Sequence, residues 1–319
     1  MSKTKPILKI VLPLLLGIVL VVYSLSQISV STLVQYFRNA NYFWIALGIF
    51  LGIVSHTSRA YRWLFMAEPL GYKPRLANSF MAVYSAYLIN FTIPRAGEIA
   101  RASILTNYEG VPFEKGFGTI VAERVADTIM LLIIIAVALF LEFEFIFNFF
   151  NEKFQPQTLV LGGLIFLVII SSIFLLVRRS RSKFATRVKS FLKGLVEGAL
   201  SIFKMKQKWA FIFHTVFIWV MYLSMFYVTT LALPELQGIS LAPVLIGFIL
   251  ASFSIAATNG GIGSFPEAIV IAFLLFSLPE DPSRAFGWIM WSSQTLIIII
   301  LGGFSLLYLP IFNRNKSSI

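Results

Sequence analysis

Residues 90–98 read Asn-Phe-Thr-Ile-Pro-Arg-Ala-Gly-Glu and interrupt an apolar stretch that runs from residue 77 to residue 108. Proline and glycine break helices and charged side chains are costly in lipid, so the stretch does not read as one continuous membrane span. Irregular backbone at membrane depth is tolerated only where protein buries it or where it lines a polar cavity. The stretch therefore predicts a helical hairpin with a polar tip inside a membrane domain.

A second stretch with the same pattern follows far along the chain. Residues 259–267 read Asn-Gly-Gly-Ile-Gly-Ser-Phe-Pro-Glu, between apolar limbs that cover residues 241–278. The limb 265–278 is short for a full crossing, which needs about 17–25 residues. Both stretches are therefore predicted to be re-entrant hairpins, typical of inverted-repeat transporters whose substrate site lies near the bilayer midplane.

Six further apolar runs are each long enough to cross a bilayer about 30 Å thick. They cover residues 7–23, 42–58, 117–141, 158–177, 209–233 and 285–309. The first run lacks a convincing cleavage site, so we expect a retained span and not a signal peptide. The pattern predicts an all-α, polytopic membrane bundle with an inverted repeat, in a single transmembrane domain of residues 1–319.

The composition excludes a soluble protein. Of 319 residues, 58% are hydrophobic and 13% are charged, against roughly 45–50% and about 25% in soluble domains. The absence of cysteine excludes disulfides and thiolate chemistry, and two histidines, His56 and His214, are too few for a histidine metal cluster. No Walker A motif is present. We expect no metal, no cofactor and no ATP-driven pumping within this chain.

The net charge of +12 is concentrated on a few segments. Basic residues gather in residues 1–9, 59–75 and 178–208 and at the C-terminus, whereas segments 24–41, 142–157 and 279–284 hold one each. Because lysine and arginine favour the cytoplasmic side, this predicts a multi-pass protein of the plasma (inner) membrane with both termini in the cytoplasm. In that topology hairpin 77–108 enters from the cytoplasm and hairpin 241–278 from outside.

The cytoplasmic basic loop, residues 178–208, carries ten of the 26 basic residues and a single acid, Glu197. Its apolar residues recur at three- and four-residue steps, which predicts an amphipathic helix on anionic lipid of the inner leaflet. A loop that only sets topology is the alternative. The membrane-surface candidates are Arg178, Arg179, Arg181, Lys183, Arg187, Lys189 and Lys193. Nucleic-acid binding is not expected, because no recognition fold accompanies the charge.

Span 117–141 contains Glu123, Arg124 and Asp127 among mainly apolar residues. Glu123 and Asp127 are four residues apart and share one helix face. A charge at the bilayer centre costs at least about 2.5–3.5 kcal/mol unless it is paired, so these residues are functional candidates. A structural ion-pair network, Arg95 or Arg101 with Glu123 or Asp127, is the alternative.

The residues expected to bind substrate lie in the two tips and in the charged span. They are Asn90, Pro94, Arg95, Gly97, Glu98, Arg101, Glu123, Arg124, Asp127, Asn259, Gly260, Gly261, Gly263 and Glu267. In this interpretation arginines contact phosphate, and acids orient them or bind a coupling cation. A structural interpretation stays open: the asparagines cap unwound helix ends, the glycines turn the chain, and Ser264 with Glu267 forms a capping box.

The ordered pattern resembles a known family, the transmembrane region of lysylphosphatidylglycerol synthases and the stand-alone flippase-like proteins related to it. The residues that carry the resemblance are Asn90, Pro94, Arg95, Gly97, Glu98 and Arg101, then Glu123, Arg124 and Asp127, with Arg62-Trp63 before them and the 259–267 turn after. The resemblance implies movement of an aminoacylated phospholipid between leaflets. The lipid is made by a soluble domain that we do not find in this sequence, so the synthase activity is not expected.

Two functions compete on these observations. The first is a transporter that moves a phospholipid or lipid-linked headgroup between leaflets, passively, by ion coupling or with a partner. The second is a membrane-embedded enzyme that acts on a polyprenyl phosphate or lipid phosphate, with Glu98 or Asp127 as base or metal ligand. A purely structural membrane partner would leave the hairpin charges unexplained. The expected partners are membrane lipids, anionic, zwitterionic or polyprenyl-phosphate; a homo-oligomer is left open.

Overall fold

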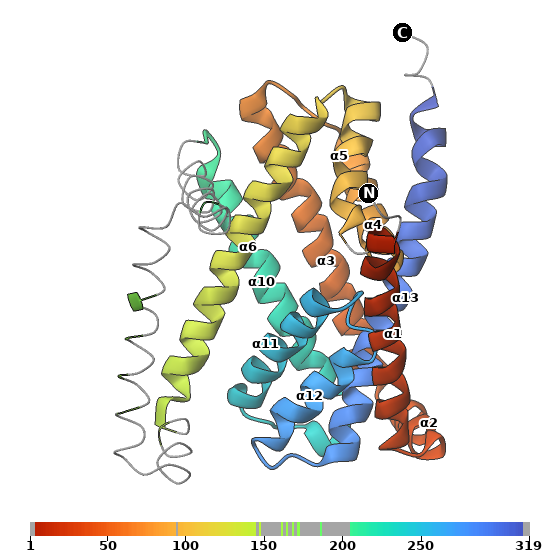
Figure 1. Ribbon diagram of the computed structural model, residues 1–319, viewed down its shortest axis with the longest axis vertical. Helices are drawn as coiled ribbons and strands as arrows, with labels where there is room; N and C mark the ends of the chain where they lie inside the picture. The colour runs from red at the N-terminus through yellow and green to blue at the C-terminus, as the bar shows by residue number, and fades with distance from the viewer. Residues whose placement is uncertain are drawn as a thin grey trace. The chain divides into compact units, whose positions relative to one another are not determined.

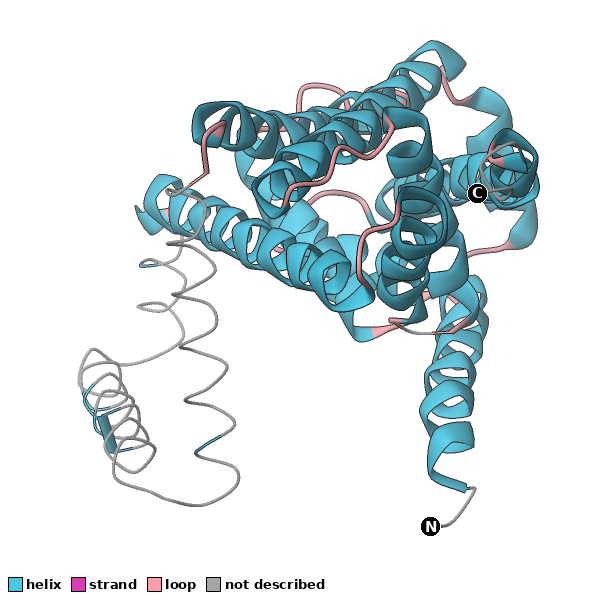
Figure 2. Ribbon diagram, turned by 90° about the horizontal axis from the view of Figure 1, so that it is seen from above, coloured by secondary structure: helices cyan, strands magenta, loops and turns pink. Residues whose placement is uncertain are grey.

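The computed structural model describes residues 4–93, 95–144 and 205–314, together with Phe147, Leu161, Leu164, Val168, Ser171, Ser172 and Thr186. Within these ranges every long regular element is a helix (Figures 1 and 2), which confirms the predicted all-α class. Pro94 and the membrane-surface candidates of the basic loop lie outside the described residues, as does nearly all of the predicted span 158–177.

Five long helices form the frame of the part of the chain that the structure describes. They are α1 (Thr4–Ser26), α3 (Tyr42–Ala67), α6 (Phe113–Leu141), α10 (Lys208–Thr230) and α13 (Glu280–Phe312). By length and composition, α3 with the short 3-10 helix η1 (Glu68–Leu70), α6, α10 and α13 are able to cross a membrane. A further candidate is the bent pair of α1 and α2 (Val30–Asn39), whose axes turn by 84°. The part of the chain that the structure describes is therefore a multi-pass helical membrane bundle.

The chain divides into two compact units, residues 1–123 with 205–319, and residues 124–204. The site described below is built from residues of the first and larger unit. Large apolar side chains point outward on its long helices: Leu296, Ile299, Ile300 and Phe304 of α13 are each more than half exposed. A soluble protein would bury side chains of this kind, whereas lipid covers them in a membrane.

Two helical hairpins lie within the larger unit, at the two places where the sequence predicts them. The first joins α4 (Leu76–Thr92) to α5 (Ala96–Glu109), and the second joins α11 (Leu241–Ala257) to α12 (Ser264–Leu274). The two helices of each hairpin pack side by side (Figure 1). All four are shorter than the frame helices, and the side from which each hairpin enters the membrane stays a prediction.

The tips of the two hairpins meet inside the larger unit. In Figure 1 the α4–α5 hairpin fills the upper part of this unit and the α11–α12 hairpin the lower part. Gly260 faces the ring of Phe91 so closely that a Cβ atom there would lie 2.7 Å from Phe91 Cδ1. The opposed approach of two broken segments is the arrangement expected of an inverted repeat.

The structure corrects two boundaries that matter for the site. The predicted span 42–58 continues as α3 to Ala67, so Arg59 and Arg62 lie inside a helix and are buried, although the sequence assigns them to cytoplasmic segment 59–75. Likewise Arg284 lies within α13 and is buried, although the sequence places it in a connection. In each case an acidic partner on another helix offsets the cost of burying the guanidinium group.

An aromatic cluster joins the second hairpin to the frame. Phe226 of α10 contacts Phe248 of α11, Phe273 of α12 and Phe286 of α13 edge to face, with ring centroids 5.1–6.5 Å apart. Phe273 and Phe286 stack with centroids 5.7 Å apart. Aromatic pairs of this geometry contribute beyond their buried area, so α11 and α12 are firmly packed against α10 and α13.

Candidate functional site

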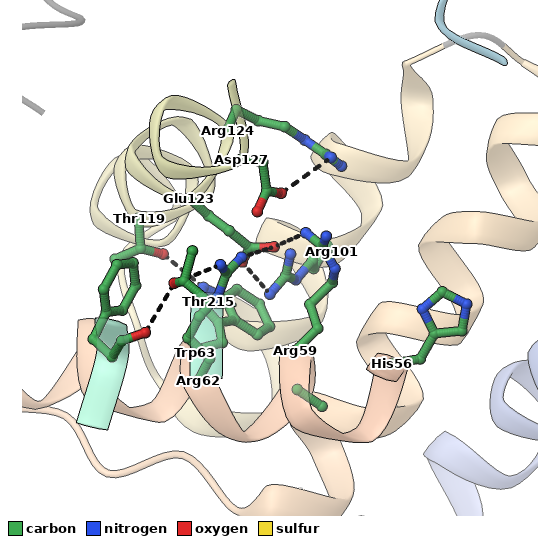
Figure 3. Close-up of polar contacts among 12 residues, drawn as sticks. His56, Arg59, Arg62, Trp63, Arg101, Thr119, Glu123, Arg124, Asp127 and Thr215 are labelled. Atoms are coloured by element: carbon green, nitrogen blue, oxygen red, sulfur yellow. Dashed lines mark hydrogen bonds and ion pairs between the residues drawn. The ribbon is translucent and has the colours of Figure 1, made fainter. Parts of the chain in front are cut away.

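Three arginines share one buried carboxylate at the centre of the candidate site (Figure 3). Glu123 Oε1 lies 2.5 Å from Arg59 Nη1 and 3.3 Å from Arg62 Nη2, and Glu123 Oε2 accepts a hydrogen bond of 2.9 Å from Arg101 Nη2. We call Arg59, Arg62, Arg101 and Glu123 the arginine cluster. The side chains of all four are at most 5% exposed.

The cluster forms because three helices each present a charged face to the same point. Arg59 and Arg62 are three residues apart on α3 and therefore lie side by side on that helix. Arg101 lies one turn into α5, beyond the hairpin tip, and Glu123 lies in the first half of α6. The predicted pairing of Arg101 with Glu123 is confirmed, and it ties the first hairpin to α6.

A layer of side chains around the cluster holds the guanidinium groups in place. Arg62 Nη1 donates a hydrogen bond of 2.9 Å to Thr215 Oγ1 on α10. The Arg101 guanidinium lies over the Trp63 ring, 3.7 Å from its centroid, and the Trp63 indole N–H donates to Thr119 Oγ1 at 2.8 Å. Hydrogen bonds and cation–π contacts of this kind stabilise buried arginine, so these neighbouring side chains hold the guanidinium groups in a defined position.

Three buried guanidinium groups of the cluster converge on one carboxylate, that of Glu123. In a medium of low dielectric constant, converging guanidinium groups attract an anion strongly. Arg101 Nε is also buried and makes no hydrogen bond with any described residue. The arrangement is therefore suited to binding an anion, and guanidinium groups match phosphate well.

A second polar branch leaves the cluster through Arg59. Its Nη2 donates to the Tyr222 hydroxyl at 3.5 Å, and this hydroxyl lies 3.3 Å from Nδ1 of His56. The His56 ring contacts Tyr84 and Tyr87 of α4, with centroids 5.6 Å and 4.7 Å away. Sequence reasoning missed this branch, as it missed Arg59 and Thr215, because nothing in the local sequence links residues of α3, α4 and α10.

The tip of the first hairpin has a structural role for two of the predicted residues. Asn90 Oδ1 accepts a hydrogen bond of 2.8 Å from the backbone N–H of Gly97, which caps the start of α5. Gly97 packs against α4 so tightly that a Cβ atom would lie 2.8 Å from the carbonyl carbon of Ala86. Arg95 adopts a left-handed conformation, with φ of 63°, and is exposed outside the cluster. Glu98 lies in the first turn of α5 and is half-buried.

Two further charges of α6, Arg124 and Asp127, belong to the smaller unit. Arg124 and Asp127 pair along the helix at 3.9 Å, with the Arg124 side chain 47% exposed and that of Asp127 10% exposed. The i,i+3 spacing brings the two side chains together on one face of the helix. Asp127 is thus a buried acid with an intrahelical partner.

The tip of the second hairpin is a glycine turn that is anchored to α13. Gly260, Gly261 and Gly263 all have positive φ values, between 67° and 78°. The Gly260 carbonyl accepts a hydrogen bond of 2.8 Å from the Trp291 indole. Asn259 is 3% exposed, and its Nδ2 makes no hydrogen bond with the described part of the chain.

The capping box expected at Ser264 and Glu267 is wrong. Gly263 holds the N-cap position of α12 without a side-chain cap, and Ser264 is the first helical residue. Glu267 instead receives hydrogen bonds from Arg284 of α13, at 3.0 Å from Nε and 3.4 Å from Nη2, and Arg284 also pairs with Glu280 at 2.9 Å. An unpaired buried guanidinium group at Arg284 would cost more free energy than a missing side-chain cap at the start of α12. Glu267 therefore links α12 to α13.

Comparison with known proteins agrees with this architecture. The family model described as the lysylphosphatidylglycerol synthase transmembrane region matches residues 10–303. The chain is also similar to the UPF0104 membrane protein MJ1595 of Methanocaldococcus jannaschii, with 24% identity over 89% of this chain and 90% of that protein. The family match covers both hairpins, the arginine cluster and most of the frame helices. The chain belongs to the family of the lysylphosphatidylglycerol synthase transmembrane region.

Proposed function

We propose that this protein moves a phospholipid, or a lipid-linked headgroup, between the leaflets of the membrane, and that the arginine cluster holds the phosphate of that headgroup. The observation that carries the proposal is the sharing of the single Glu123 carboxylate by Arg59, Arg62 and Arg101. Buried guanidinium groups that converge on one point are costly in a membrane, and an anionic ligand offsets that cost.

The position of the cluster in the fold supports transport. Arg101 ties the first hairpin to α6, and Arg284 ties the second hairpin to α13. Between these two anchors the hairpin tips meet through the close packing of Phe91 on Gly260. A small relative movement of the two anchored bodies would part the tips and expose the site to one leaflet or the other. Alternating access of this kind is the usual mode of inverted-repeat transporters.

The expected substrates are anionic or zwitterionic phospholipids, or a polyprenyl-phosphate lipid, because all of these carry a phosphate group beside apolar chains. The expected setting is the plasma (inner) membrane, with both termini in the cytoplasm and the basic loop 178–208 on anionic lipid of the inner leaflet. The residues expected to bind substrate at the tips, including Asn259, Gly261 and Gly263, would line the path that a headgroup follows.

The alternative function, an enzyme acting on a lipid phosphate, needs an acid placed as base or metal ligand. Glu98 and Asp127 are the acids that the sequence offers for this role. Among the described residues, no group of three histidine, aspartate or glutamate side chains is arranged to hold a metal ion. No observation in the described part of the chain favours this alternative over transport.

Purified protein in proteoliposomes separates the two functions. Fluorescent phosphatidylglycerol, phosphatidylethanolamine and phosphatidylcholine are incorporated in both leaflets, and the outer-leaflet label is bleached with dithionite. A transporter lets the bleaching proceed beyond the outer leaflet for at least one of these lipids. Failure with all three, together with turnover of a polyprenyl-phosphate sugar, would refute transport and support the enzyme.

A further inference from the structure

We propose that His56 is a proton-binding site that is coupled to the arginine cluster, so that a proton on His56 and a phosphate-bearing headgroup on the cluster each strengthen the binding of the other. The inference rests on the proposed function for the identity of the headgroup. It adds a second ligand, the proton, and a source of energy for directed movement.

The geometry places the imidazole one hydroxyl group away from the cluster. Arg59 Nη1 contacts Glu123 at 2.5 Å, while Arg59 Nη2 reaches the Tyr222 hydroxyl at 3.5 Å. The same hydroxyl lies 3.3 Å from His56 Nδ1. Tyr222 therefore stands between the cluster and the only histidine of α3, and its oxygen touches both neighbours.

The direction of these hydrogen bonds depends on whether His56 carries the extra proton. A guanidinium group only donates, so the Tyr222 oxygen must accept from Arg59. With Nδ1 of His56 unprotonated, the Tyr222 O–H donates to it. Once Nδ1 binds a proton it becomes a donor, and the Tyr222 oxygen then accepts from both neighbours. The Tyr222 O–H then no longer donates to His56, and it can donate to an anion beside Arg59 instead.

Charge acts in the same direction as this exchange of donors. A protonated His56 and Arg59 are like charges separated by one hydroxyl group in a medium of low dielectric constant, so each disfavours the other. An anion bound at the cluster offsets the charge of Arg59 and thereby favours the proton on His56. Because coupling between two binding sites is reciprocal, the proton must favour the anion equally.

The surroundings of His56 contain few other groups able to produce this effect. Among the described residues, the charged and titratable groups that face it are Arg59 on its own helix, Tyr84 and Tyr87 on α4, Tyr222 on α10 and, through Arg59, Glu123 on α6. Helix α13 also packs against α3 but carries no titratable residue between Arg284 and Tyr308. Glu68 of η1 lies about 18 Å further along the α3 axis, at 1.5 Å per residue.

The aromatic rings around His56 suit a site that is sometimes charged. Tyr84, Tyr87 and Tyr222 surround the imidazole with centroids 5.6, 4.7 and 5.8 Å away, and ring faces attract cations at such distances. The Tyr84 hydroxyl is buried and makes no hydrogen bond with the residues described. The Tyr84 hydroxyl is therefore a hydrogen-bonding group near the imidazole.

The test measures proton uptake when purified protein in detergent binds dioctanoyl phosphatidylglycerol. Its phosphodiester keeps one charge at about pH 4 and at about pH 8. The lower value lies well below the ordinary imidazole pKa of about 6.5, because burial beside Arg59 disfavours the charged imidazole. Calorimetry in buffers of different ionisation enthalpy counts the protons taken up. We expect net proton uptake and binding about tenfold tighter at the lower pH, within the usual range of coupling between sites.

Variants assign the uptake to one histidine. His56→Gln is expected to abolish both the uptake and the pH dependence. His214→Gln is the matched control, because His214 is the other histidine of the chain and hydrogen-bonds to Ser58 at 2.8 Å on α3. It is expected to keep both. Tyr222→Phe leaves the histidine in place and is expected to reduce the pH dependence, which keeps the test decisive if His56→Gln does not fold.

Three results overturn the inference: binding that is equal at the two pH values, uptake that survives in His56→Gln, or uptake that is lost in His214→Gln. Dimethyl phosphate is titrated in parallel. Full proton uptake with dimethyl phosphate but none with the lipid would show that the coupled site binds a free phosphate, and would overturn the assignment to a lipid headgroup. Coupled binding without movement of lipid in proteoliposomes refutes the proposed function alone. Movement of lipid with pH-independent binding refutes the coupling alone, and absence of any binding refutes both.

Discussion

Phe91, at the tip of the α4–α5 hairpin, packs against Gly260, at the tip of the α11–α12 hairpin, with no room for a side chain at the glycine. The two residues are far apart in the sequence, and each belongs to one of the two helical hairpins. In the described part of the larger unit, these hairpins are the places where a polar turn breaks an apolar stretch. The contact therefore joins the two hairpins at their tips, as the predicted inverted repeat requires.

Substitution of Gly260 by alanine tests this seam. The new Cβ atom would overlap the Phe91 ring, and the residue would have to keep a φ of 67° that alanine rarely adopts. We expect Gly260→Ala to lower the free energy of unfolding by about 2–4 kcal/mol, from overpacking and backbone strain together. Thermal or denaturant unfolding in detergent measures the change.

The steric part of that loss has its own control. Phe91→Ala removes the ring that the new methyl group would meet, so the double variant is expected to recover part of the loss, and the backbone strain is expected to remain. The effect of Phe91→Ala alone is subtracted from that of the double variant. If the remaining loss in the free energy of unfolding equals that of Gly260→Ala, the two tips do not press on each other.

Removal of the shared carboxylate tests whether the arginine cluster is held by Glu123. Glu123→Gln leaves three buried guanidinium groups without the acid that they contact, and breaking a buried ion pair from one side costs about 3–5 kcal/mol. Arg101→Gln together with Glu123→Gln is expected to be less destabilised than the sum of the two single changes, since the pair is removed as a unit. Strict additivity of the two losses would contradict the pairing.

Single-cysteine labelling tests the orientation of the two hairpins, since the natural chain contains no cysteine. Glu114 lies in the first turn of α6, after the first hairpin, and Asp281 lies in the first turn of α13, after the second; both are exposed. In intact cells we expect an impermeant thiol reagent to label Asp281→Cys and to leave Glu114→Cys unlabelled until the cells are opened. The reverse pattern would place both termini outside.

The hairpins could be predicted from the sequence because their tips combine features that act locally. Proline, glycine and charge within an apolar run forbid a straight lipid-facing helix wherever the rest of the chain lies. The pairing of Arg101 with Glu123 was also within reach, since few acids lie in the spans. The role of Asn90 as a cap followed from its place at a helix break.

The partners of Arg59, Arg62 and Arg284 could not be predicted, and the reason is physical. A basic residue at the end of an apolar run looks the same in sequence whether it marks a cytoplasmic loop or pairs inside the protein. The difference lies in a partner that is 64 residues away for Arg59 and 17 residues away for Arg284. Only the ion pairs between α3 and α6, and between α13 and α12, reveal which case applies.

Whether the arginine cluster holds the phosphate of the headgroup is tested by comparing two arginine variants in the phospholipid-movement assay. Arg101→Gln removes one guanidinium group from the arginine cluster. Arg75→Gln removes an arginine that also pairs with an acid of α5, Glu109, but lies outside the cluster. With equal amounts of folded protein per vesicle, we expect Arg101→Gln to slow lipid movement at least about tenfold, since a charge-assisted contact to phosphate contributes about 1.5–3 kcal/mol. Arg75→Gln is predicted to keep the wild-type rate. Equal rates for wild type, Arg101→Gln and Arg75→Gln would contradict the claim that the cluster holds the headgroup.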